Sequence, residues 1–192
     1  MKLEELGAGT FIYRCRGALA PDFCDDVVSR FEASPTEQYE GRVGQQQERH
    51  APIKKTMDLR ISGKAQWKDV DGALFASLRE ALSSMAHTHP FFGSNSFKDI
   101  GYNLQRYREG EYYHWHVDSG PGSFSQRQLV AIWYLNDVDG PGGETEFAFQ
   151  NLTVRPKRGD LLLFPPFWTH VHRAVTLQGG VKYIATTWVC FA

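Results

Sequence analysis

The sequence contains few cysteines. Its three cysteines, Cys15, Cys24 and Cys190, cannot all pair within one chain, and their spacing is not that of a metal-binding motif. A disulfide framework and a cysteine-rich zinc centre are therefore excluded as the basis of the fold. Reduced thiols are typical of cytoplasmic proteins, and we expect this compartment.

Long apolar runs and an excess of one charge are also missing. The first ten residues, MKLEELGAGT, lack the apolar core of a signal peptide, and no apolar run approaches the length of a membrane span. The 21 basic and 22 acidic residues are interspersed, so the chain has no broad basic surface for a nucleic-acid backbone. We therefore expect neither a membrane nor a nucleic acid as a partner.

The length of 192 residues is that of one domain. We expect a single domain over residues 1–192, in which residues 1–98 provide a supporting strand, helices and a polar loop. Residues 99–192 are expected to form the core. Apolar residues recur at helical spacing between residues 68 and 86, which predicts a helix with one face packed on a sheet.

A long polar stretch follows the first predicted helix, which covers residues 21–33. Residues 35–55 are rich in Gln, Gly and Arg, and a loop of this length is usually mobile or functional. Residues 38–55 contain few apolar side chains, and Gly41 and Gly44 give the backbone the freedom that a closing lid needs. We expect this segment to close over a substrate.

The second half of the chain has the pattern of a β domain. Short apolar and β-branched runs alternate with Gly, Pro and Asn, as in a mainly β fold with flanking helices. The predicted architecture is a double-stranded β-helix, the cupin-like jelly roll. Its eight predicted strands cover residues 100–107, 112–118, 128–136, 144–149, 152–156, 160–166, 172–177 and 181–191.

Histidine and aspartate side chains in this half can bind a metal. His116 and Asp118 lie two residues apart in a β-prone run, so alternation along a strand sends both to the same side of the sheet. His170 and His172, which share one strand parity, each offer a second imidazole. Two imidazoles and a carboxylate bind one face of Fe(II) and leave the other open for oxygen chemistry. Taken singly, a surface histidine and a turn aspartate explain His116 and Asp118 as well.

Lys182 is the next charged residue of interest. In the run VKYIATTW it is either a solvated strand residue or an anchor at the end of an apolar barrel. As an anchor, its ammonium would pair with one carboxylate of a dicarboxylic acid.

Three motifs occur in order in the second half. They are YREGEYYHWHVD, then RQLVAIWYLND followed by GGETEF, and finally PKRGDLLLFPPFWTHVHRAVTLQGGVKYIATTW. From about residue 99 to 191 the chain resembles the Fe(II)/2-oxoglutarate dioxygenases, and within them the prolyl 4-hydroxylase-like branch. A lone HxD pair is weak support, but the ordered combination is specific.

The resemblance implies an iron site and a cosubstrate. The iron ligands and catalytic residues are His116, Asp118 and His172, because the family spacing to the basic anchor selects His172. His170 is then expected beside the ligands or in the pocket. The implied cofactors are Fe(II) and the cosubstrate 2-oxoglutarate, with ascorbate as an optional addition.

The resemblance also implies a cosubstrate pocket. Lys182 is expected to bind the 5-carboxylate of 2-oxoglutarate, and Tyr134 to donate a hydrogen bond there. Tyr107 aligns with a tyrosine that contacts the cosubstrate. Tyr107, Tyr134 and Tyr113 also suit core positions, and we expect Tyr113 above all to be structural.

The function implied by the resemblance is hydroxylation of a prolyl residue in a protein or peptide, with dioxygen as the oxidant. A hydroxylase of a free amino acid or other small metabolite is an alternative, and a catalytically silent jelly-roll binding module is another. We expect the polar loop and nearby aromatic side chains to shape a peptide groove, with Arg127 facing either substrate or solvent. The aromatic candidates are Phe91, Phe92, Phe167 and Trp168.

Overall fold

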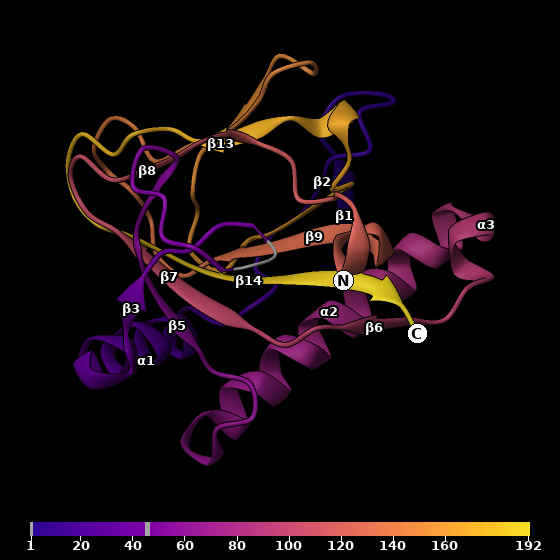
Figure 1. The fold of residues 1–192 in the computed structure, drawn as a ribbon. Coiled ribbons are helices and arrows are strands. Elements are labelled where there is room, and N and C mark those ends of the chain that lie inside the picture. Colours follow the sequence, from indigo (N-terminus) through magenta and orange to yellow (C-terminus); the bar gives the residue numbers. More distant parts are fainter. Residues whose placement is uncertain (1, 45–46) are drawn as a thin grey trace.

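Two antiparallel sheets face each other, and helices cover the outer side of the larger one (Figure 1). The computed structural model describes residues 2–44 and 47–192, so two positions of the predicted loop, residues 45 and 46, lie outside the described residues. Helix α1 (Pro21–Glu32) and helix α2 (Lys68–Thr88) form the helical layer, and α3 (Pro90–Gly93) is a short turn after α2.

The larger sheet has nine strands among the described residues. Their order is β1 (Leu3–Glu5), β2 (Tyr13–Cys15), β12 (Leu161–Phe164), β9 (Arg127–Tyr134), β14 (Lys182–Phe191), β7 (Asn103–Tyr107), β5 (Met57–Arg60) and β3 (Tyr39–Glu40), and β6 (Phe97–Asp99) also pairs with β14.

The smaller sheet has five strands in the described part of the chain. Their order is β11 (Leu152–Val154), β10 (Thr145–Phe147), β13 (His172–Ala174), β8 (Tyr112–His116) and β4 (Lys54–Lys55). The eight strands predicted after residue 99 are all present as β7 to β14. The predicted jelly roll is therefore confirmed.

Strand β12 shows why its sequence is continuously apolar. Leu161 and Leu163 pack in the core between the larger sheet and the helices, whereas Leu162 and Phe164 pack between the two sheets. Because neighbouring residues of a strand point to opposite faces, a strand covered on both sides needs apolar residues at every position. The interior between the sheets surrounds the candidate site.

Helix α2 has the amphipathic pattern predicted for residues 68–86. Val70, Leu74, Leu78 and Met85 are buried, and they pack against the larger sheet. In the part of the chain that the structure describes, no helix combines the length and apolar character needed to cross a membrane.

The predicted loop over residues 38–55 is only partly a loop. Its first residues form β3, which pairs with β5, and its last residues form β4, which pairs with β8. Lys54 is 5% exposed. The expectation of one continuous loop over this segment is therefore wrong at both ends, because backbone pairing and a buried ion pair hold them.

Candidate metal and cosubstrate site

Three potential metal ligands converge where β8 and β13 lie side by side. His116 ends β8, Asp118 follows two residues later, and His172 begins β13 directly opposite His116 in the strand register. One ligand atom from each residue lies within 4.8 Å of the others. The carboxylate Oδ2 of Asp118 is 3.2 Å from Nε2 of His172 and 3.9 Å from Nε2 of His116.

Backbone carbonyls orient both imidazoles. Nδ1 of His116 lies 2.7 Å from the carbonyl oxygen of His114, and Nδ1 of His172 lies 2.9 Å from that of His170. A carbonyl only accepts, so each Nδ1 carries the hydrogen and each Nε2 presents a lone pair to the cluster. Burial, reinforced by His172, lowers the pKa of His116 to about 3, so its imidazole is neutral.

The third group, Asp118, is ionised. Burial raises the pKa of Asp118, but its contacts with His172 and His116 and the positive charge of Arg127 outweigh burial and keep this pKa below its ordinary value. Its backbone is fixed as well, since its N–H donates to Pro166 and its carbonyl accepts from Arg127. Two neutral imidazole nitrogens and one carboxylate oxygen fit a ferrous ion.

Lys182 is a buried cation that lines the same cavity as the three candidate ligands. Its side chain is 1% exposed, and its Nζ donates to the carbonyl oxygen of Gly143 at 2.7 Å. Among the described residues it forms no ion pair. Its Nζ lies 4.9 Å from the ring centroid of Tyr107 and 5.8 Å from that of Tyr134. A buried ammonium without a carboxylate partner suits an anionic ligand.

An inner cavity connects Lys182 with the three candidate ligands. It is lined by Gln105, Tyr107, Tyr113, His116, Asp118, Val130, Ile132, Thr145, His172, Arg173, Ala174, Lys182, Ile184, Thr186 and Trp188. Within it, Oγ1 of Thr186 and Nε1 of Trp188 are buried and have no hydrogen-bond partner among the residues that the structure describes. They lie on the same face of β14 as Lys182. The cavity thus offers a cation, polar donors and a metal site to a slender dicarboxylate.

The pH dependence of stability follows from the burial of Lys182. Burial lowers the pKa of this amine to about 7 from an ordinary 10.5, and Glu144 opposes the shift only in part. As pH falls from about 10 to about 7, the unfolded chain takes up a proton that the folded chain does not. The ligand-free protein should therefore lose roughly 3–4 kcal/mol of unfolding free energy over this window relative to Lys182→Met.

Denaturant unfolding of the wild type and Lys182→Met, at several pH values in this window, measures that difference. Below about pH 7 both states of the wild type carry the proton, and the difference should become constant. A difference that does not change with pH would mean that Lys182 is solvated.

The predicted tyrosines have different surroundings. The hydroxyl of Tyr107 donates to Gln105 at 3.1 Å, and its ring lines the inner cavity. The hydroxyl of Tyr134 lies 2.7 Å from that of Thr145, behind the cavity wall. Contact of either with the cosubstrate stays a prediction. Tyr113, expected to be structural, lines the cavity and stacks on His116 with ring centroids 3.5 Å apart.

A β-bulge accounts for the position of Tyr113. The pairing of β8 with β13 shifts register between His172 and Ala174. His116 pairs with His172 and Tyr113 pairs with Ala174, so three steps along β8 correspond to two steps along β13. In a regular strand, residues three apart face opposite sides; the bulge brings them to the same side. The sequence carried no signal for this irregularity.

His170 does not have the strand parity that was predicted for it. It lies in a 3₁₀ turn (Trp168–His170), and its Nε2 contacts the carbonyl oxygen of Thr10 at 2.8 Å. Only the backbone carbonyl of His170 contacts a candidate ligand, because it accepts from Nδ1 of His172 and so orients that ring. The side chain does not line the inner cavity.

An outer groove opens beside the three candidate ligands. It has a volume of about 510 Å³ and shares Tyr113, His116, Asp118 and Trp188 with the inner cavity. Arg127 lies in its wall between two rings, 3.7 Å from the centroid of Phe124 and 4.0 Å from that of Trp188. The polar loop contributes Arg42, Val43, Gly44, Gln47 and Ile53.

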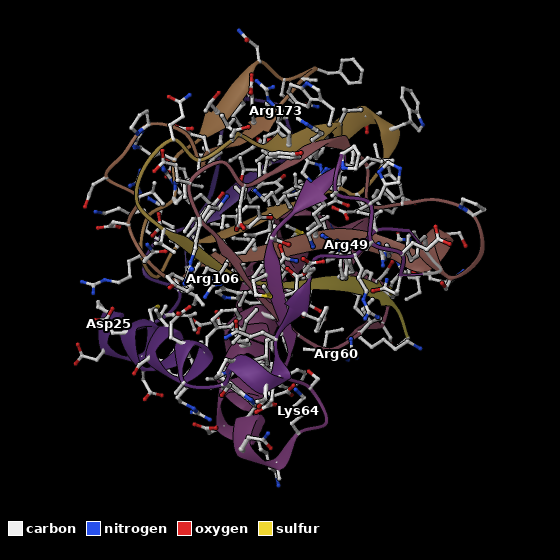
Figure 2. The ribbon with its side chains drawn as sticks, turned by 60° about the vertical axis from the view of Figure 1, so that its left-hand side comes forward. Asp25, Arg49, Arg60, Lys64, Arg106 and Arg173 are labelled. Carbon is white, nitrogen blue, oxygen red and sulfur yellow. The ribbon has the colours of Figure 1, made fainter. Side chains whose placement is uncertain are left out.

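The aromatic residues expected in a peptide groove lie elsewhere. Phe91 and Trp168 are 93% and 76% exposed, and Phe92 and Phe167 line a separate surface depression. The groove instead uses Trp115, Phe124 and Trp188. Arg173, on the smaller sheet away from the helices, stacks on Trp115 at 4.5 Å (Figure 2).

Comparison with known proteins agrees with this site. Residues 102–190 match the 2OG-Fe(II) oxygenase superfamily, and this part of the chain belongs to that superfamily. The chain is thus similar to 2-oxoglutarate-dependent dioxygenases, and its fold resembles that of prolyl hydroxylases. Its family and its His-Asp-His cluster imply Fe(II) and 2-oxoglutarate.

One curated relative is a PKHD-type hydroxylase of Teredinibacter turnerae. The two proteins are 28% identical in an alignment of 144 positions, which covers 70% of this chain and 62% of the relative's length.

Solved structures share the fold. A viral collagen prolyl hydroxylase from Paramecium Bursaria Chlorella virus-1, in its 2OG complex, has a TM-score of 0.72 and 19% identity, covering 98% of this chain and 100% of that one. A Trichoplax adhaerens prolyl hydroxylase, in complex with a hypoxia inducible factor peptide fragment, has a TM-score of 0.77 and 15% identity over 95% of this chain and 84% of that one. A Pseudomonas putida prolyl-4-hydroxylase has a TM-score of 0.72 and 21% identity, covering 95% of this chain and 94% of that one.

Proposed function

We propose that this protein hydroxylates prolyl residues in a protein or peptide, using Fe(II), 2-oxoglutarate and dioxygen. The observation that carries the proposal is the geometry of one cavity. The three ligand atoms of His116, Asp118 and His172 converge at its mouth, and the unpaired ammonium of Lys182 lies inside it.

Each side chain has a defined task in this proposal. His116, Asp118 and His172 would hold Fe(II), and Lys182 would pair with the distal carboxylate of 2-oxoglutarate. When bound, iron and 2-oxoglutarate supply the oxidising chemistry of this class, in which a C–H bond is hydroxylated and succinate and carbon dioxide are released. The apolar walls of the cavity exclude water from the reacting groups.

The outer groove supports a peptide as the substrate. It is open, it borders the ligands, and Arg127 is held rigidly in its wall by two aromatic rings. A guanidinium fixed in this way can donate hydrogen bonds to the carbonyl oxygens of an extended peptide. The Trichoplax neighbour with a bound peptide supports the same class of substrate.

A screen of proline-containing peptides by mass spectrometry tests the proposal. Hydroxylation predicts the gain of one oxygen on the peptide together with an equal amount of succinate. Oxygen gain on a free amino acid alone would favour the small-metabolite alternative. Binding of Fe(II) and 2-oxoglutarate without succinate release with any candidate would favour the silent binding module. The same assay with and without ascorbate shows whether this reductant sustains turnover.

The proposal treats residues 1–192 as one domain. Helices from residues 1–98 and strands from residues 99–192 share one buried core, which supports this arrangement. A single cooperative unfolding transition, seen alike by fluorescence and circular dichroism, is expected.

The middle of the polar loop should govern substrate binding rather than iron chemistry. Residues 42–44 and Gln47 line the groove but contribute no candidate ligand. Replacing residues 43–48 with two glycines, which leaves β3 and β4 intact, should raise the Michaelis constant for peptide about tenfold or more. Decarboxylation of 2-oxoglutarate without peptide should persist.

Peptide and succinate kinetics of this loop variant provide the measurement, and limited proteolysis gives an independent check. Cleavage of the wild type should fall at Arg42 or Arg49, where side chains are exposed, and not at the buried Lys54. Unchanged peptide kinetics in the variant would show that the loop is a neutral surface excursion.

A further inference from the structure

A buried ion pair closes the edge of the sandwich beside the site. Lys54 belongs to β4 in the smaller sheet, and Asp58 belongs to β5 in the larger sheet. Nζ of Lys54 lies 2.8 Å from Oδ2 of Asp58, and each side chain is 4% exposed. The pair therefore joins the two sheets at the edge where the polar loop leaves and returns.

Hydrogen bonds connect the carboxylate of Asp58 to both ends of the polar loop. Thr56 donates to its Oδ1 at 2.7 Å, and Asn103 donates to its Oδ2 at 3.3 Å. The hydroxyl of Tyr39, on β3, donates in turn to Asn103 at 3.0 Å. The start of the loop at Tyr39 and its end at Lys54 are thus held by one buried group.

The loop backbone passes close over this pair. Gly41 donates its N–H to the carbonyl oxygen of Thr56 at 2.9 Å. A Cβ at Gly41 would lie 2.1 Å from Oγ1 of Thr56 and 3.0 Å from Cε of Lys54, so only glycine fits here. Farther along the loop, Arg49 pairs with Glu40 of β3 at the same edge (Figure 2).

The same pair reaches a candidate metal ligand through Tyr113. Lys54 lies opposite Tyr113 in the register of β4 and β8, and its Nζ is 5.3 Å from the Tyr113 ring centroid. That ring stacks on His116 at an interplanar angle of 11°. Since β4 has two residues, its backbone pairing with β8 alone is weak, and the ion pair holds β4 in place by joining it to β5 of the larger sheet.

A buried ion pair is a poor device for stability alone. Apolar residues of similar volume usually stabilise a core as well or better, because both charges must be removed from water. The pair instead specifies one geometry of the side chains around it, because a buried charge is stable only where its partner can reach it.

We propose that Lys54, held by Asp58, is a positioning residue for His116 and for the groove-lining loop. It fixes the ring of Tyr113 against His116 and sets where the polar loop borders the groove. This inference rests on the proposed function, in which His116 binds the metal.

Co(II) titration, followed by its visible absorption, tests the inference on the full chain. The variants are Lys54→Met, Asp58→Asn and the double variant, with Lys55→Met as the matched control, because Lys55 is the exposed neighbour on β4. Each single variant should lower the melting temperature by leaving a buried charge unpaired. The double variant, which removes both charges, should regain most of the lost melting temperature.

The double variant should still bind Co(II) about tenfold more weakly than the wild type, and its absorption band should be shifted. Loss of a group that orients a metal ligand usually weakens metal binding by this amount. Lys55→Met should match the wild type. A double variant with wild-type Co(II) affinity and spectrum, whatever its melting temperature, would overturn the inference, because the pair would then not position His116.

Hydrogen exchange of the wild type decides the matter even if the variants fail to fold. The amide of His114, which donates to the carbonyl oxygen of Ile53 at 2.9 Å, should be as protected as the amides of β13. Fast exchange there would overturn the inference. Failure of the proposed metal site is distinct, since the wild type and His116→Ala would then bind Co(II) equally poorly.

Discussion

Replacing His172 with alanine is expected to abolish turnover and to weaken metal binding by more than about 100-fold, because it removes one of three ligands. The fold should persist. The lost side chain packs against Phe147 and Phe164 in an otherwise apolar interior, so the cavity should cost about 1–3 kcal/mol of unfolding free energy. Metal titration, turnover and denaturant unfolding measure the three quantities.

His170→Ala is the matched control for this variant. Both histidines are buried and lie two residues apart, but the His170 side chain contacts Thr10 and not the cavity. Its variant should keep its metal affinity, because the carbonyl that orients His172 remains. Wild-type turnover in His172→Ala together with loss in His170→Ala would reverse the choice between the two imidazoles.

Replacing Lys182 with methionine should weaken 2-oxoglutarate binding by roughly 2–4 kcal/mol, or about 30- to 1,000-fold in dissociation constant. Methionine fills most of the space but leaves a ligand carboxylate without its counter-ion. Metal affinity should change little, because Lys182 is not one of the three candidate ligands. Competition binding of 2-oxoglutarate to the Co(II)-loaded protein gives the constant.

Lys98→Met is the control, since Lys98 is an exposed lysine of the same sheet. It should bind 2-oxoglutarate like the wild type. Equal affinity in Lys182→Met would show that the anchor lies elsewhere and would also remove the reason for assigning Tyr134 to its pocket.

Side-chain periodicity carried most of the fold prediction. The alternation of β9 sends Leu129, Ala131 and Trp133 towards the helices and the residues between them towards the other sheet. Patterns of this kind depend only on local geometry, so they can be read without knowing the partner strands. The same holds for the amphipathic face of α2.

Contacts that depend on an irregularity or on distant partners were not predicted. Tyr113 reaches His116 through a β-bulge. Lys54 is buried because it donates to Asp58 of the other sheet, a carboxylate that also accepts from Thr56. A polar sequence around Lys54 gives no sign of burial, since burial of a charge depends on a partner that the local pattern does not specify. His170 does not lie on a strand with His172, as was expected, because the chain forms a 3₁₀ turn before β13 begins.

Anaerobic addition of Fe(II) and 2-oxoglutarate to the purified protein tests the central claim most directly. If His116, Asp118 and His172 hold iron while Lys182 anchors 2-oxoglutarate, a weak visible charge-transfer band should appear only when both are present. The band should be absent from His172→Ala, and in Lys182→Met it should require far more 2-oxoglutarate. A wild-type protein that gives no band, or a band of equal strength in His172→Ala, would contradict the proposed site.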